Sequence, residues 1–155
     1  MLRVGSCFVL PKMSDALRKQ IKETVRLHGH LGPFLVIAVR IGRLANEKLK
    51  PNHSEHCSLQ AHFKVPLHPP HSCMLDGIQS TIQCTVGKGR LSFEEPEKIA
   101  AEFRLHGLDS TLQTTVDPKF VKSLMQQIKT GVPLDLLAEH AASMEEDGLF
   151  KIKLN

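Results

Sequence analysis

The chain has 155 residues, a length typical of one domain with a core of its own. Hydrophobic residues make up 41% and charged residues 23%, which excludes the composition of a disordered chain. There is no Trp or Tyr and the net charge of +4 is spread along the chain, which argues against the stacking surfaces and basic blocks of nucleic-acid binders. We therefore expect a single domain over residues 1–155 that binds no nucleic acid.

The cysteines and the hydropathy pattern indicate in which cellular compartment the protein is expected. Four cysteines, Cys7, Cys57, Cys73 and Cys84, stand in a chain whose first residues are too interrupted for a secretory leader. No apolar run approaches the roughly 20 residues that a membrane span needs. We therefore predict reduced thiols and a soluble, cytoplasmic protein with no membrane partner. Residues 1–12 share no period with the next segment and are predicted to be an N-terminal extension.

Two helices are predicted in the first third of the chain. An apolar stripe with helical spacing runs from Ser14, a residue type favoured at the N-cap, to His28. A second helix is predicted over residues 33–49, because proline suits the first helical position and the segment is apolar on most sides. Gly42 in its interior indicates tight packing against another backbone, with a subunit boundary as one place for it.

The rest of the chain mixes helices and strands. Helical spacing and capping residues predict further helices over residues 73–83, 118–129 and 133–146. Alternation of apolar and polar residues predicts strands over residues 57–65, 91–93, 98–106, 111–116 and 149–154. This order indicates an α+β fold with an antiparallel-rich sheet and no regular βαβ repeat.

The stretch LHGHLGPF is the first candidate for chemistry. His28 and His30 are separated by a glycine that allows a sharp turn, so both rings can face one pocket. The free N–H groups of the helix that starts at Pro33 lie beside them and favour an anion or a carboxylate. Spacing leaves a second interpretation equally open, in which His28 is a core histidine and His30 a polar cap.

The stretch CMLDGIQ is the second candidate. Cys73 and Asp76 are one helical turn apart, so a thiolate and a carboxylate can meet one metal ion together with an imidazole from elsewhere. Cys73 also lies in the first turn, where the helix dipole lowers a thiol pKa and favours a ligand or a nucleophile. Cys84 is roughly 16 Å further along a straight helix, so we expect a buried, hydrophobic cysteine unless the chain folds back.

Other signals are weaker. Gly87-Lys88-Gly89 lacks the remainder of a phosphate-binding loop, so it does not predict nucleotide binding. Four histidines in polar or proline-rich loops are predicted to be solvated: His53, His56, His68 and His71. No pair of C-x-x-C units occurs, which excludes a structural zinc finger of that kind.

Taken together, the two candidate stretches resemble the FmdE family, which takes its name from a subunit of formylmethanofuran dehydrogenase. Its members typically carry HGHxCPG before an apolar helix, then C-x-x-D-A-I-Q followed by G-C-T-x-G-K. The counterparts in this chain are HGHLGPF from His28, CMLDGIQ from Cys73 and QCTVGKG from Gln83. The resemblance covers roughly residues 14–103, with two separate motifs in the same order.

The resemblance implies an α+β core that assembles as an intertwined homodimer, with a cavity lined by the His, Cys and Asp of these motifs. Some relatives add a C-terminal zinc finger, and this chain looks like the core domain alone. Two positions depart from the family pattern. Gly32 replaces a cysteine and removes one soft ligand, and Gly77 replaces an alanine, which should loosen the helix while keeping Asp76 in place.

Our leading hypothesis is a homodimeric metal-binding protein in which His28, His30, Cys73 and Asp76 surround a divalent ion. Mixed imidazole, thiolate and carboxylate ligands suit zinc, and nickel or iron would also fit. Cys73 and Asp76 are the residues expected to carry catalysis on an unidentified small molecule, although the sequence does not define a reaction. The first alternative is a non-catalytic accessory subunit of a larger molybdenum or tungsten enzyme. The second is a reactive thiol at Cys73 with a histidine as its base.

Overall fold

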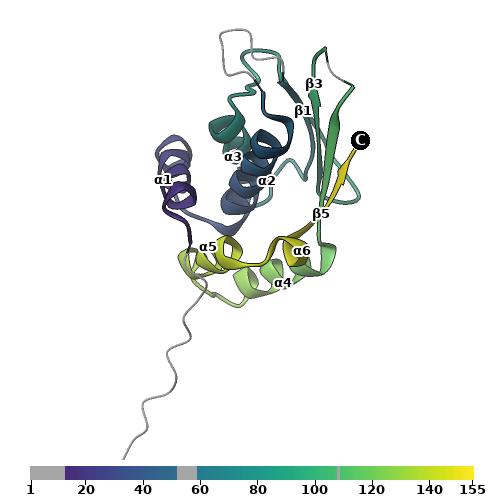
Figure 1. The fold of residues 1–155 in the computed structure, drawn as a ribbon. Coiled ribbons are helices and arrows are strands. Elements are labelled where there is room, and N and C mark those ends of the chain that lie inside the picture. The colour runs from purple at the N-terminus through teal and green to yellow at the C-terminus, as the bar shows by residue number, and fades with distance from the viewer. Residues whose placement is uncertain (1–12, 52–58, 108) are drawn as a thin grey trace, which may run out of the picture.

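The computed structural model describes residues 13–51, 59–107 and 109–155, and in these ranges the chain forms one five-stranded sheet and six helices (Figure 1). The helices are α1 (Asp15–His28), α2 (Pro33–Leu49), α3 (Cys73–Ile82), α4 (Pro118–Lys129), α5 (Leu134–Ser143) and α6 (Glu146–Leu149). The strands are β1 (Leu59–Lys64), β2 (Leu91–Glu94), β3 (Ala100–Leu105), β4 (Thr111–Val116) and β5 (Phe150–Leu154). The predicted α+β class is confirmed.

The sheet has the strand order β2-β1-β3-β4-β5. β1 and β2 are parallel and are joined through α3, whereas the pairs β1–β3, β3–β4 and β4–β5 are antiparallel. Parallel neighbours need a crossover of a dozen or more residues, and α3 with its flanking loops supplies it. The crossover brings the N-terminus of α3 back over the sheet, toward α1 and α2.

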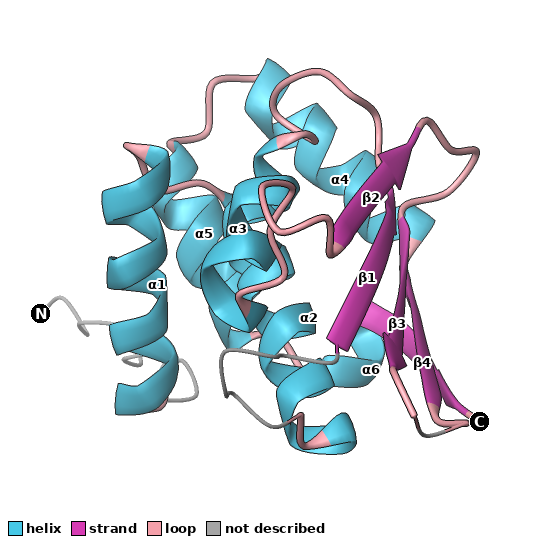
Figure 2. Cartoon of the chain, turned by 90° about the horizontal axis from the view of Figure 1, so that it is seen from above, coloured by secondary structure: helices cyan, strands magenta, loops and turns pink. Residues whose placement is uncertain are grey.

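One face of the sheet carries the core. Figures 1 and 2 show α1, α2 and α3 on that face, with α4, α5 and α6 gathered at one end. Along β1, side chains alternate between buried and more exposed, so that Phe63 faces the helices and His62 faces away. Burial of apolar area on this side is the main stabilising contribution to the fold.

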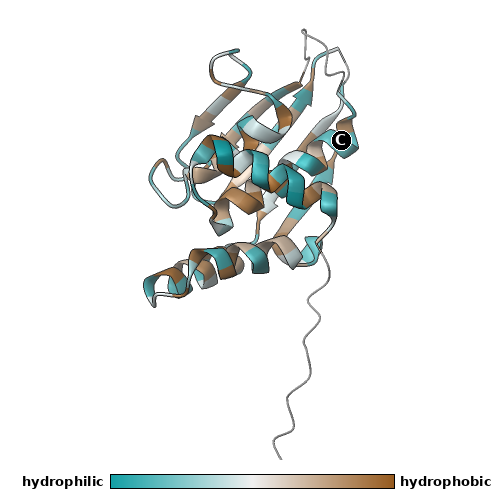
Figure 3. Ribbon diagram, turned by 90° about the vertical axis from the view of Figure 1, so that its left-hand side faces the viewer, coloured by the Kyte–Doolittle hydropathy of each residue, from teal (hydrophilic) through white to brown (hydrophobic). Residues whose placement is uncertain are grey.

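The helix α2 is the centre of the helical layer. Twelve of its residues are buried, among them Phe34 and Ile37, which confirms the prediction of a central helix. By contrast α1 is amphipathic, and Figure 3 shows hydrophilic and hydrophobic residues mixed along it where it lies in front. None of the helices in the described ranges is long and apolar enough to cross a membrane.

Close packing of α2 on α3 depends on two glycines. A Cβ added at Gly42 would lie 2.8 Å from Cβ of Thr81, and one added at Gly77 would lie 2.7 Å from Cβ of Ala38. The predicted close approach at Gly42 is therefore made to α3 of the same chain. Gly77 was expected to loosen α3, and it instead lets α3 lie directly against α2.

One predicted helix differs from the structure, and one predicted strand is described only in part. The helix predicted over residues 133–146 is two helices, because the chain becomes extended at Met144. The side chain of Arg40 donates to the carbonyl oxygens of Ala141 and Met144, at 2.9 and 2.6 Å, and satisfies the end of α5. The strand predicted from residue 57 is seen from Leu59. Its first two residues, like the extension at residues 1–12, lie outside the described residues.

Candidate metal centre

The first wall of the site is the junction between α1 and α2. His28 is the last residue of α1, and Gly29 then takes a left-handed conformation with φ of 103°, which glycine adopts without strain. Gly32 is extended and precedes Pro33 at the start of α2. The turn between the two helices brings the rings of His28 and His30 to a centroid distance of 4.5 Å.

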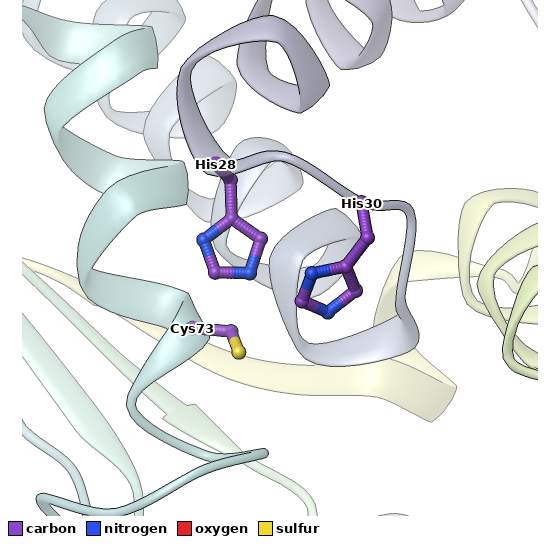
Figure 4. A group of neighbouring side chains, drawn as sticks. All are labelled: His28, His30 and Cys73. Atoms are coloured by element: carbon purple, nitrogen blue, oxygen red, sulfur yellow. The ribbon is translucent and has the colours of Figure 1, made fainter.

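The second wall is the N-terminus of α3. Cys73 begins this helix, and its sulfur meets the two imidazoles although the two segments are more than forty positions apart in the chain. One ligand atom from each of His28, His30 and Cys73 lies within 4.8 Å of the other two. Figure 4 shows both rings and the Cys73 sulfur turned toward the same space. The two histidines therefore lie together with Cys73, with His28 partly buried and His30 exposed.

A carboxylate from α3 holds the His28 ring. Nδ1 of His28 lies 2.6 Å from Oδ2 of Asp76. An ionised carboxylate only accepts hydrogen bonds, so the imidazole donates through Nδ1, and in its neutral form the lone pair is on Nε2. That Nε2 atom is buried and has no hydrogen-bond partner among the described residues. Asp76 thus lies beside the group as a hydrogen-bond partner of His28. The sequence had predicted it as a fourth metal ligand.

The environment of Cys73 opposes a free thiolate. Burial raises the pKa of this thiol, the nearby charge of Asp76 raises it further, and a backbone hydrogen bond lowers it by less. The expected lowering by the helix N-terminus is therefore outweighed, because the low-polarity surroundings and a like charge both disfavour S⁻. A bound cation would reverse this balance, since a coordinated thiol is deprotonated.

The Gly32 position leaves room where the family carries a cysteine. A Cβ built there would have the Cδ2 and Nε2 atoms of His30 as its nearest neighbours, both at 3.9 Å, which is ordinary van der Waals contact. The backbone at Gly32 is extended, a conformation open to any residue. A thiol at this position would therefore start beside the His30 ring.

Cys84 and His71 were predicted to lie outside the site, and neither belongs to the His/His/Cys group. Cys84 is fully buried and its Sγ contacts the carbonyl oxygen of Leu59 at 3.1 Å, as expected for a hydrophobic cysteine. His71 was predicted to be solvated, and this prediction is wrong: the residue is 9% exposed and its ring packs against Phe34. The polar, proline-rich sequence around it gave no signal of burial. His53 and His56 lie outside the described residues.

Fold and site together define an α+β protein with a His/His/Cys cluster between two helices of one layer. The family model described as "FmdE, Molybdenum formylmethanofuran dehydrogenase operon" matches residues 27–151. The chain therefore belongs to the FmdE family, as its two motifs predicted. The match includes both walls of the cluster.

A solved structure supports the same fold. The chain resembles a tungsten formylmethanofuran dehydrogenase FmdE-like protein from Syntrophus aciditrophicus, with a TM-score of 0.60 and 14% sequence identity. The resemblance covers 90% of this chain and 71% of the other. No curated protein matches the chain. At this identity the structural likeness concerns the fold alone.

Proposed function

We propose that His28, His30 and Cys73 bind a divalent metal ion, and that the ion is zinc. The observation that carries this proposal is the buried, unpaired Nε2 of His28, whose other ring nitrogen is held by Asp76. Metal-binding histidines commonly donate their second nitrogen to a carboxylate in this way, which fixes the ring and its tautomer. Two imidazoles and one thiolate are a donor set that zinc prefers, and nickel or iron accept the same atoms.

Three protein ligands suit a catalytic metal more than a structural one. Structural zinc sites are closed by four protein ligands, whereas catalytic sites keep one position for water or substrate. His30 is exposed and Cys73 half-buried, so a small molecule can approach the group from solvent. In such a site zinc supplies Lewis acidity and lowers the pKa of bound water. Cys73 would contribute the thiolate and Asp76 would orient His28, on a small-molecule substrate that the donor set does not identify.

The same proposal includes a homodimer in the cytoplasm. The intertwined dimer rests on resemblance to the family. The compartment rests on the cysteines, because among the described residues Cys73 and Cys84 are both thiols, and reduced cysteines are typical of the cytoplasm.

Elemental analysis of protein purified without a histidine tag tests the metal centre. We expect close to one zinc per chain in the wild type and a large loss in both Cys73→Ser and His30→Ala. His106→Ala is the matched control, because His106 is an exposed histidine outside the group, and its zinc content should equal that of the wild type. Equal metal in all four proteins would refute the proposal.

A non-catalytic accessory subunit is the second candidate function. It is favoured by the description of the family, which refers to the operon of a molybdenum formylmethanofuran dehydrogenase. In this function the chain docks on a larger oxidoreductase. Co-purification with such an enzyme that survives both a chelator and Cys73→Ser would favour it over the metal-dependent enzyme.

A metal-free nucleophilic thiol at Cys73 is less well supported. Burial and Asp76 both raise the pKa of this thiol, so little thiolate exists at neutral pH without a cation. This alternative would be supported by an activity that persists after metal removal and disappears when Cys73 is alkylated.

A further inference from the structure

A second cavity lies outside the His/His/Cys group. It has a volume of about 250 Å³ and is bordered by the loop after β1, the connection from β2 to β3, and the junction of β4 with α4. Three prolines form part of its wall: Pro66, Pro96 and Pro118. Proline has a fixed φ and loses little conformational entropy on folding, so these walls are comparatively rigid.

The cavity combines an apolar lining with an excess of positive charge. Ile99, Val116 and Val121 contribute apolar side chains. Two exposed lysines, Lys98 and Lys122, also line it. Among the described residues, neither lysine forms an ion pair.

One acidic residue, Glu97, lines the same cavity, so the formal charge of the lining is one positive unit. Electroneutrality within the cavity therefore favours a ligand with a single negative charge. An apolar ligand body would be accommodated by the aliphatic side chains, as in most small-molecule sites.

A buried histidine completes the lining. His71 is 9% exposed, and its Nδ1 is buried without a hydrogen-bond partner in the part of the chain that the structure describes. Its ring is held between Phe34, at 4.8 Å between centroids, and His68, at 5.4 Å. Because Nδ1 is out of reach of solvent, the part of His71 that lines the cavity is the rest of its ring.

We propose that this cavity binds a small organic monoanion, with an apolar body against the aliphatic wall and its carboxylate between Lys98, Lys122 and the His71 ring. The volume corresponds to about eight water-sized groups, so the ligand is small, of the size of a substituted benzoate or a short branched acid. One imidazole and two lysines are not a metal donor set. The inference therefore stands independently of the proposed zinc.

Titration with benzoate tests the proposal. Binding is monitored in ¹H–¹⁵N correlation spectra of the full chain in the presence of EDTA. The chelator prevents benzoate from binding through a metal at Cys73. We expect saturable shifts at the amides of Lys98, Ile99 and Val121. Benzamide has the same shape without charge and should bind at least about tenfold more weakly, because its neutral carbonyl oxygen accepts weaker hydrogen bonds from the lysines than a carboxylate does.

The lysines provide the discriminating variants. In Lys98→Met/Lys122→Met, benzoate affinity should fall at least about tenfold and approach that of benzamide. Both side chains are exposed, so the fold should be retained. Lys119→Met is the matched control on α4, since Lys119 is exposed and outside the cavity, and its affinity should equal that of the wild type.

His71→Phe addresses the buried ring. It replaces the imidazole with an apolar ring and should weaken benzoate more than benzamide. Equal binding of benzoate and benzamide by the wild type would overturn the proposal, as would unchanged benzoate affinity in the double lysine variant. Shifts confined to residues outside the cavity, or no saturable shift at all, would also overturn it.

Discussion

Two glycines on facing segments lie in opposite surroundings. At Gly77, in the middle of α3, an added Cβ would lie 2.7 Å from Cβ of Ala38 and 2.8 Å from the carbonyl oxygen of Leu35. At Gly32, beside the His/His/Cys group, the nearest atoms would be 3.9 Å away. The helical layer is therefore packed too closely for a Cβ at Gly77 but has room for one at Gly32. Close packing fixes α3 against α2 and thereby fixes where Cys73 lies, while position 32 can accept a side chain.

Gly32→Cys is expected to have the largest effect. It places a second thiol beside His30, so the proposed zinc site gains a fourth protein ligand and binds zinc on the order of a hundredfold more tightly. The measurement is competition with a chromophoric chelator. Gly32→Ser is the control, because it adds a side chain of similar size without a thiolate and should change affinity little. A Cys variant that behaves like the Ser variant would place position 32 outside the metal's reach.

Gly77→Ala tests the packed side of the comparison. Alanine favours a helix over glycine by about 1 kcal/mol, but the new Cβ overlaps α2, and overpacking of this kind costs about 1–3 kcal/mol. We expect a net loss of up to about 2 kcal/mol in the free energy of unfolding, measured with urea. Gly87→Ala, in an open turn, should change stability by less than about 0.5 kcal/mol.

A second substitution decides whether the overlap is the cause. Ala38→Gly removes the Cβ that lies 2.7 Å from the added one, so the pair Gly77→Ala/Ala38→Gly should be more stable than the sum of the two single changes predicts. Additive effects would mean that the carbonyl oxygen of Leu35, or the helix backbone itself, accounts for the loss.

The packed helical layer and the site differ in how far the sequence predicts them. The bounds of α2 follow from Pro33 and from a hydrophobic run that ends at Leu49, so periodicity and local conformational preference agree. The end of α5 could not be predicted in this way. It depends on a donor from Arg40, about a hundred positions earlier, and no Gly or Pro marks the break.

The site was predicted as a set of residues but not as a geometry. Helical spacing placed Cys73 and Asp76 on one side of α3, and both do lie at the junction with α1. Spacing cannot tell which atom meets which partner, so Asp76 was predicted as a ligand and is found on Nδ1 of His28. His71 is buried against Phe34, which belongs to α2. The loop sequence around His71 does not indicate this contact.

Asp76→Asn sharpens the role of this carboxylate. If Asp76 orients His28, as the distance of 2.6 Å indicates, the amide keeps the shape but weakens the hold on Nδ1. We expect zinc affinity to fall by about tenfold, the lower end of what such outer partners contribute. Competition with the same chelator measures the effect. A loss as large as that of Cys73→Ser would instead make Asp76 a direct ligand.

The smallest expected effect concerns the thiol of Cys73 in metal-free protein. Its pKa is raised by burial first and by the charge of Asp76 second, so at pH 7 the thiolate fraction should be below that of a free cysteine. The rate of iodoacetamide alkylation should therefore rise with pH through a midpoint above that of a small free thiol. Removing the negative charge in Asp76→Asn lowers the thiol pKa and should speed alkylation at pH 7 a few-fold, read by mass spectrometry at Cys73. Because burial remains in the variant, the midpoint of alkylation should stay above that of the free thiol. A midpoint at or below that of the free thiol would mean that water beside Gly32 solvates the thiolate. The two glycines would then differ in the polarity of their surroundings as well as in packing.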